Sequence, residues 1–206
     1  MQEQELTHIV YSKEVVEFVT VSNEFCLLAE QVQDFDKADF INRSRKLLPL
    51  VYFKAAVLPN PDESTDEFYQ KFVHEADWHY IEQRISQKLG ISERFITITE
   101  PADKLEAEEV SLAECYADIY QDLKDFVTLY QIGNELSVNE ALWELKENFE
   151  QVWGPRLLAL LSELHNIEFS GDTLEDEQED KDTHLSQNQK KQDDFEQINP
   201  QNLFSK

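Results

Sequence analysis

The sequence is short of basic residues, glycine and proline. It has 18 lysines and arginines against 43 aspartates and glutamates, so the formal net charge is −25. A chain this acidic repels phosphate groups, which argues against general nucleic-acid binding and against docking on anionic lipid. Four glycines and six prolines in 206 residues exclude the collagen and low-complexity classes.

Cysteine and long apolar runs are also scarce. Cys26 and Cys115 are too few for a disulfide framework, and neither has a CxxC neighbour. Both lie in apolar segments, so we expect reduced core residues, as in the cytoplasm.

The amino terminus lacks the basic start and apolar run of a signal peptide. No stretch approaches the roughly 18 apolar residues of a membrane helix. The sequence therefore predicts a soluble cytoplasmic protein without a membrane segment.

Apolar side chains recur at helical spacing through most of the first 167 residues. The segment 38–58 is apolar almost all round, which predicts a buried helix, and Pro49 should kink or split it. Residues 94–99 have strand propensity but no expected pairing partner, so 91–110 is interpreted as a loop with an extended piece. The predicted helices are 12–33, 38–58, 66–90, 111–133 and 137–153, with a further piece that runs to about Ile167.

Composition changes at Ser170, where aspartate, glutamate, glutamine, asparagine and lysine become dominant. A segment of this kind buries too little apolar surface to offset its ordering entropy. We predict that 170–206 is a disordered acidic tail. Residues 1–169 are predicted to be one domain, an all-α compact bundle of five to six helices.

Three stretches of the chain resemble a known family. They are LPLVYFKA at 48–55, ADIYQDLKDFV at 117–127 and FEQVWG at 149–154. Together they resemble an uncharacterised bacterial family, catalogued only as a domain of unknown function, over about residues 8–168. The resemblance implies a compact, all-helical, cytosolic protein. It implies no activity, cofactor or catalytic residue.

Four acids share one face of the segment 111–133. Glu114, Asp118, Asp122 and Asp125 span an arc of about 80° at the helical period. Carboxylates so placed could share a divalent cation. The ExxE and ExxD pair of helical nucleotide pyrophosphatases is, however, in the wrong order and setting in this chain. We interpret the four as a solvated face and assign no metal and no cofactor.

Three cations are candidates for binding. Lys54 lies in an apolar run, where its ammonium must reach solvent or a carboxylate of a neighbouring helix. Arg43 and Lys46 are three residues apart and share a helix face. Either they bind a phosphate group or a partner, or they pair with acids on adjacent helices.

Arg156 lies in the first turn of the last helix, where a cation is disfavoured by the helix dipole. This placement suggests a partner carboxylate. Trp153, which precedes the Gly154-Pro155 break, is interpreted as a packing anchor. Tyr52, Tyr120 and Trp153 could instead line a pocket between helices.

The sequence favours a non-enzymatic interaction, adaptor or regulatory protein of the cytosol. Its acidic surface and tail would contact a protein partner with a basic or polar surface. One alternative is a metal-dependent nucleotide or phosphate hydrolase that uses acids near Asp118 and Asp122. The other is a small-ligand-binding helical protein with an aromatic pocket. We assign no catalytic residue.

Overall fold

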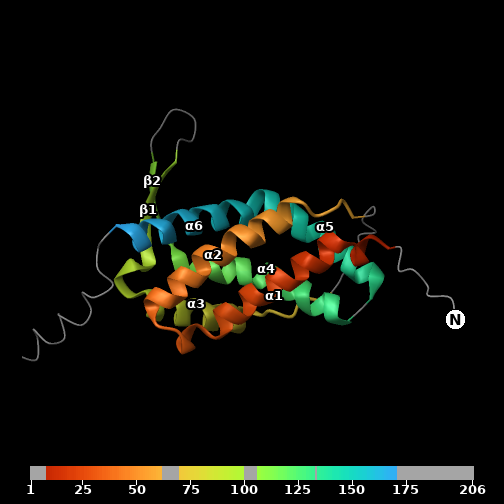
Figure 1. Ribbon diagram of the computed structural model, residues 1–206, viewed down its shortest axis with the longest axis horizontal. Coiled ribbons are helices and arrows are strands. Elements are labelled where there is room, and N and C mark those ends of the chain that lie inside the picture. Colours follow the sequence, from red (N-terminus) through yellow and green to blue (C-terminus); the bar gives the residue numbers. More distant parts are fainter. Residues whose placement is uncertain (1–7, 62–69, 100–105, 133, 171–206) are drawn as a thin grey trace, which may run out of the picture. The chain divides into compact units, whose positions relative to one another are not determined.

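Long helices follow the apolar periodicity of the sequence and are joined by short connections (Figure 1). The computed structural model describes residues 8–61, 70–99, 106–132 and 134–170. The predicted all-α bundle is confirmed. The predicted tail lies, apart from Ser170, outside the described residues. The six α-helices of the described part are α1 (Lys13–Glu30), α2 (Lys37–Ala56), α3 (Glu75–Leu89), α4 (Leu112–Ile132), α5 (Glu135–Asn148) and α6 (Gly154–Phe169).

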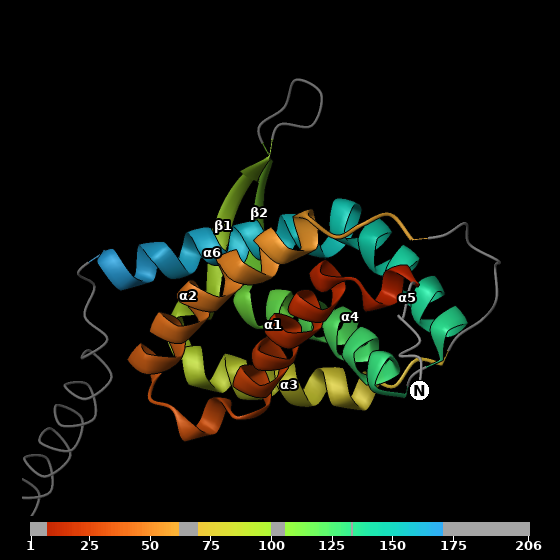
Figure 2. The same cartoon turned by 45° about the vertical axis from the view of Figure 1, so that its right-hand side comes forward.

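Helix α4 lies at the centre and packs against α1, α3, α5 and α6. Figure 2 shows α1, α4 and α3 side by side. The buried ring of Tyr116 on α4 stacks on Phe25 of α1, with centroids 5.5 Å apart, and meets Phe40 of α2 at 5.4 Å. Burial of large side chains from three helices at this point stabilises their packing.

Polar side chains fix where several helices begin. Ser111 Oγ accepts a hydrogen bond from the Glu114 amide at 3.0 Å, as in half of an S-x-x-E capping box. Asn134 caps α5 through Oδ1, so this helix begins at Glu135, two residues before its predicted start. Helix α3 begins at Glu75 rather than near residue 66, because His74 and Asp77 form its capping box.

Helix α2 differs from expectation in two ways. Pro49 does not split it, and its ring lies on the exposed side of one continuous helix. The prediction of a helix buried all round is wrong, because α2 packs on α1 and α6 and its outer face is open. Leu50, Phe53 and Val57 are 51%, 57% and 41% exposed.

The segment 91–110 is also corrected by the structure. Strand β1 (Arg94–Thr99) pairs antiparallel with β2 (Glu106–Ser111), so that Arg94 lies opposite Ser111 and Thr99 opposite Glu106. The hairpin projects from the helices in Figures 1 and 2. Its second strand was not expected because three glutamates within EAEEVS resemble the acidic first turn of a helix.

A π-helical turn, Phe149–Trp153, joins α5 to α6. The Gly154 amide donates to the Phe149 carbonyl, so the predicted break at Gly154-Pro155 is a widened helical turn and the helical path continues. Pro155 fits here because it occupies the first turn of α6. The described residues contain no helix with the length and apolar character needed to span a membrane.

Candidate functional site

One carboxylate joins three helices. Asp118 of α4 accepts a hydrogen bond from the Trp78 indole of α3 at 2.9 Å through Oδ1. Its Oδ2 is ion-paired with the guanidinium of Arg156, in the first turn of α6. The partner carboxylate that the sequence suggested for Arg156 is therefore present. It offsets the unfavourable position of a cation at a helix N-terminus.

A groove of about 300 Å³ opens beside this contact. Strand β2 contributes Glu109, α4 contributes Glu114 and Asp118, and α6 contributes Arg156. Three carboxylates therefore face one guanidinium. The rest of the lining consists of Val110, Ser111, Cys115, Pro155 and Ala159, most of which are apolar. The groove can attract a cation and also cover an aliphatic stem.

The thiol in this wall is not a nucleophile at neutral pH. Burial raises the pKa of Cys115 to about 11, so the thiolate is scarce. Cys26 is also buried and free. The prediction of two reduced core cysteines is confirmed.

Asp125, on the same predicted acidic face, binds a backbone segment and does not line the groove. Buried Asp125 accepts hydrogen bonds through Oδ1 from the backbone amides of Phe72 and Val73, at 2.7 and 2.8 Å. In the same segment, Lys71 is ion-paired with Glu144 of α5 at 2.7 Å. These contacts hold the chain that precedes α3 against α4 and α5.

Asp122 lies between these groups. It accepts a hydrogen bond from Asn148 at 3.2 Å, and burial raises its pKa to about 6. The cavity it lines with Asp125 and Glu144 measures about 10 Å³, which is no larger than a single water requires. The interpretation of all four acids as a solvated face is therefore wrong, because Asp125 is buried and Asp122 is largely buried, whereas Glu114 and Asp118 line the groove. Within the described ranges, no three His, Cys, Asp or Glu residues are arranged to hold a metal ion.

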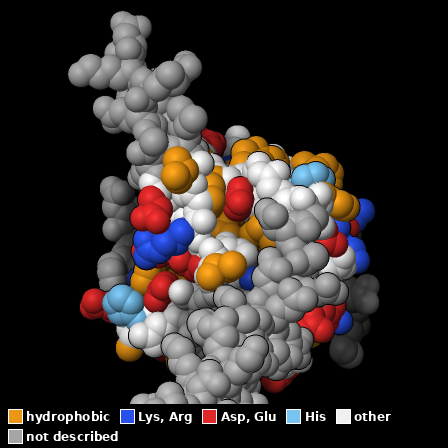
Figure 3. Space-filling view, turned by 90° about the vertical axis from the view of Figure 1, so that its left-hand side faces the viewer, with side chains coloured by type: hydrophobic (Ala, Val, Ile, Leu, Met, Phe, Trp, Pro, Cys, Tyr) orange, Lys and Arg blue, Asp and Glu red, His pale blue; other side chains and the backbone are white. Residues whose placement is uncertain are grey.

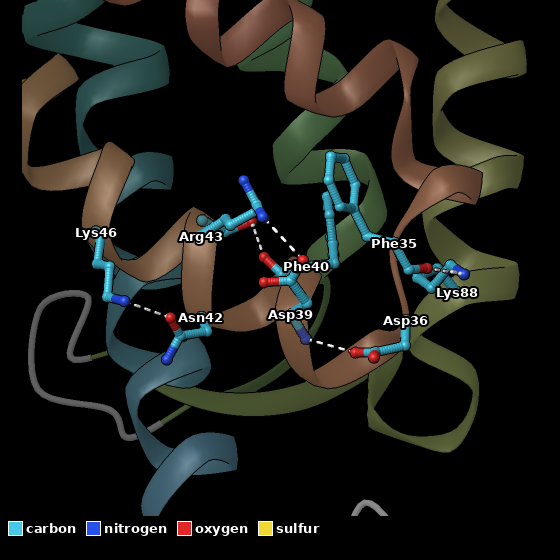
Figure 4. A network of polar contacts seen from close by, with 9 residues as sticks. Phe35, Asp36, Asp39, Phe40, Asn42, Arg43, Lys46 and Lys88 are labelled. Atoms are coloured by element: carbon cyan, nitrogen blue, oxygen red, sulfur yellow. Dashed lines mark hydrogen bonds and ion pairs between the residues drawn. The ribbon is translucent and has the colours of Figure 1, made fainter.

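The three cations that the sequence analysis named as binding candidates, Lys54, Arg43 and Lys46, all lie on α2. Lys54 donates to Glu17 of α1 at 2.7 Å, which confirms the expected ion pair with a neighbouring helix. Arg43 pairs with Asp39 at 2.8 Å and Lys46 donates to Asn42 at 2.5 Å, both within α2 (Figure 4). The structure therefore does not bring Lys54 and the Arg43 cluster to Asp118 or Asp122. Figure 3 shows an end of the domain on which acidic, basic and apolar side chains are interspersed.

The three candidate aromatic residues are dispersed. Tyr52 meets Phe149 edge-on at 5.2 Å, and Tyr120 donates its hydroxyl to Glu30 at 2.9 Å. Trp153 is fully buried and donates to the Leu145 carbonyl, as expected of a packing anchor. Neither of the two cavities described above is lined by any of the three.

The lining residue Glu109 and two residues that hold the lining in place were missed in the sequence. The indole of Trp78 orients Asp118, and buried Glu93 accepts a hydrogen bond from Ser111 at the base of the hairpin. Both contacts join residues from different elements, and local spacing gives no signal of them.

The fold and the groove define the class of this protein: a helical bundle that carries one β-hairpin and an acidic groove. Residues 9–170 match the model of a family described as a domain of unknown function, DUF5063, and the chain belongs to that family. A similar solved structure is the crystal structure of protein BF1032 from Bacteroides fragilis, a structural-genomics target. It is 30% identical, with a TM-score of 0.74 over 81% of this chain and 99% of that chain. No curated protein matches the chain.

Proposed function

We propose that this protein is a non-enzymatic interaction protein of the cytosol that holds a basic side chain of a protein partner in the groove. The observation that carries the proposal is the lining of the groove. Glu109, Glu114 and Asp118 come from two different elements and outnumber Arg156, and apolar side chains lie among them in the lining.

The chemistry of the groove suits lysine or arginine. Asp118 is already neutralised by Arg156, and Glu109 is ion-paired with Arg94 at 3.3 Å. Glu114 is exposed at the start of α4 and offers its carboxylate to an incoming cation. The aliphatic stem of that cation would lie against Val110 and Pro155. The overall charge of −25 adds long-range attraction for a basic partner.

The alternative functions have less support. A metal-dependent hydrolase would gather its acids around a metal ion, whereas Asp118 and Asp125 are used in contacts that hold helices and a backbone segment together. A small-ligand binder retains one favourable observation, because about 300 Å³ is at the lower end of ligand sites. Its ligand would then be an organic amine rather than a molecule held by the aromatic residues.

The test is a titration of the isotope-labelled full chain with short peptides. One peptide carries lysine and arginine, and the matched peptide carries glutamate at the same positions. We expect the basic peptide alone to shift backbone resonances of β2 and of the first turns of α4 and α6, and salt to weaken the effect.

Two variants test whether the basic peptide binds in the groove. Glu114→Lys should abolish the shifts, whereas Glu147→Lys, which makes the same change at an exposed position of α5, should keep them. Circular dichroism checks that both variants fold. If the basic peptide leaves the groove residues unshifted, or if Glu114→Lys binds it as well as the native chain does, the proposal is wrong. Binding of a free amine in place of the peptide would favour the small-ligand alternative.

A further inference from the structure

The exposed face of α2 carries a regular stripe. Arg43, Lys46, Leu50, Phe53 and Val57 are all exposed and follow one another at steps of three, four, three and four residues. This is the spacing at which a helix presents a seam to a second helix. At about 1.5 Å per residue the stripe is about 21 Å long. We call these five residues the α2 stripe.

The α2 stripe has two chemically different halves. Its N-terminal half is cationic, with Arg43 and Lys46, and its C-terminal half is apolar, with Leu50, Phe53 and Val57. Helix α2 has five basic residues and one acidic residue, although the chain has a net charge of −25. On the stripe itself, Asp39 balances Arg43, whereas the hydrogen bond of Lys46 goes to the neutral amide of Asn42, so Lys46 carries the net positive charge of this face.

Two cations beside the α2 stripe form ion pairs with neighbouring helices. Lys54 is paired with Glu17 of α1, and Arg45 with Glu168 of α6 at 3.4 Å. These two pairs fasten α2 to its neighbours. The ion pair of Arg43 and the hydrogen bond of Lys46 both go to residues of α2 itself. The guanidinium of Arg43 also lies 4.8 Å from the centre of the Phe35 ring, which positions it (Figure 4).

We propose that the α2 stripe is a docking site for an amphipathic acidic helix of a partner protein. Leucine-type side chains of that helix would cover Leu50, Phe53 and Val57, and its carboxylates would meet Arg43 and Lys46. A second copy of this chain fits less well. In a parallel pair the cations would face cations, and in an antiparallel pair they would face the apolar half. This surface is separate from the groove, and the proposal does not depend on it.

The test uses a synthetic helical peptide of about three heptads, with leucine at the seam positions of one half and glutamate at those of the other. A matched peptide has glutamine in place of glutamate, so that it is not a ligand for the acidic groove. Binding to the full chain is measured by fluorescence anisotropy of the labelled peptide. We expect saturable binding of the glutamate peptide, weakened by salt, and at least about tenfold weaker binding of the glutamine peptide.

Two variants with matched controls locate the site. Phe53→Ser removes an exposed aromatic anchor and should weaken binding at least about tenfold. Its control is Ile132→Ser, an exposed apolar residue at the end of α4. Lys46→Glu should weaken binding and remove most of its salt dependence, and its control is Lys13→Glu on α1. Both controls should bind as the native chain does.

Three outcomes would overturn the proposal. The first is equal binding of the glutamate and glutamine peptides. The second is binding that survives both Phe53→Ser and Lys46→Glu. The third is a dimer in sedimentation equilibrium that Phe53→Ser dissociates, because the α2 stripe would then be covered by a second copy of the chain.

Discussion

The carboxylate of Asp122 opposes folding at neutral pH, so its replacement by an amide should stabilise the domain. Burial is the first cause of the raised pKa, and the nearby charges of Glu144 and Asp125 act in the same direction. The hydrogen bond from Asn148 and the charge of Lys71 act against them. Asp122→Asn removes the charge and keeps an Oδ1 acceptor for Asn148.

The magnitude follows from the pKa of this group in the two states. It rises from 3.8 to about 6 on folding, a difference of about two units. One unit corresponds to about 1.4 kcal/mol, so ionised Asp122 costs the folded state up to about 3 kcal/mol at pH 7. Because the folded pKa is the higher one, the stabilising contribution of the protonated acid is complete below about pH 4 and is lost as the pH rises through 6.

The assay is urea unfolding of the native chain and of Asp122→Asn between pH 4 and pH 8. The free energy of unfolding of the variant, minus that of the native chain, should rise with pH between about 4 and 6 and then level off. The control is Glu147→Gln, which removes an exposed carboxylate of α5 and should give a flat difference. A flat or falling difference for Asp122→Asn would refute the reasoning.

Three further changes have defined outcomes. Asp125→Ala leaves two backbone amides of the segment before α3 without their acceptor, and should lower the free energy of unfolding by about 3–5 kcal/mol in the same urea assay. Gly154→Ala places a methyl group against the carbonyl oxygen and ring of Phe149, and should lower the melting temperature through a loss of about 1–3 kcal/mol. Cys26 and Cys115 should react with a thiol reagent at pH 8 only after denaturation, and rapid labelling of the folded chain would contradict their burial.

Most of the fold can be predicted from periodicity, because a helix that packs on a core repeats its apolar residues every three or four positions. The start of α3 was predicted wrongly, at residue 66 instead of Glu75. An apolar stripe does not show which polar residue accepts hydrogen bonds from the first backbone amides of a helix. The β-hairpin was missed for a different reason. Strand β2 is acidic and takes its conformation from pairing with β1, which is a contact between separate segments.

In the candidate site, the sequence predicts which cations need a partner but not which carboxylate each of them meets. Lys54 and Arg156 were each expected to pair with a carboxylate, because a cation in an apolar run or at a helix N-terminus needs one. Their partners, Glu17 and Asp118, are 37 and 38 residues away in sequence, and only the packing of helices selects them. Buried Asp125 was grouped with solvated acids for the same reason, because the backbone amides that donate to it belong to a separate segment of the chain.

The π-helical turn between α5 and α6 fixes how the chain tolerates changes of length. Such a turn holds one residue more than an α-helical turn, and the wider turn takes up that residue without rotating the helix that follows. Deleting one of the exposed residues 150–152 would close the turn to the regular α-helical form and leave the buried row of Leu157, Leu160 and Leu164 facing the core. Deleting one residue within α6 before Leu157 would instead turn this row by about 100°. Relatives that keep this packing can therefore differ by one residue at the junction but not within α6.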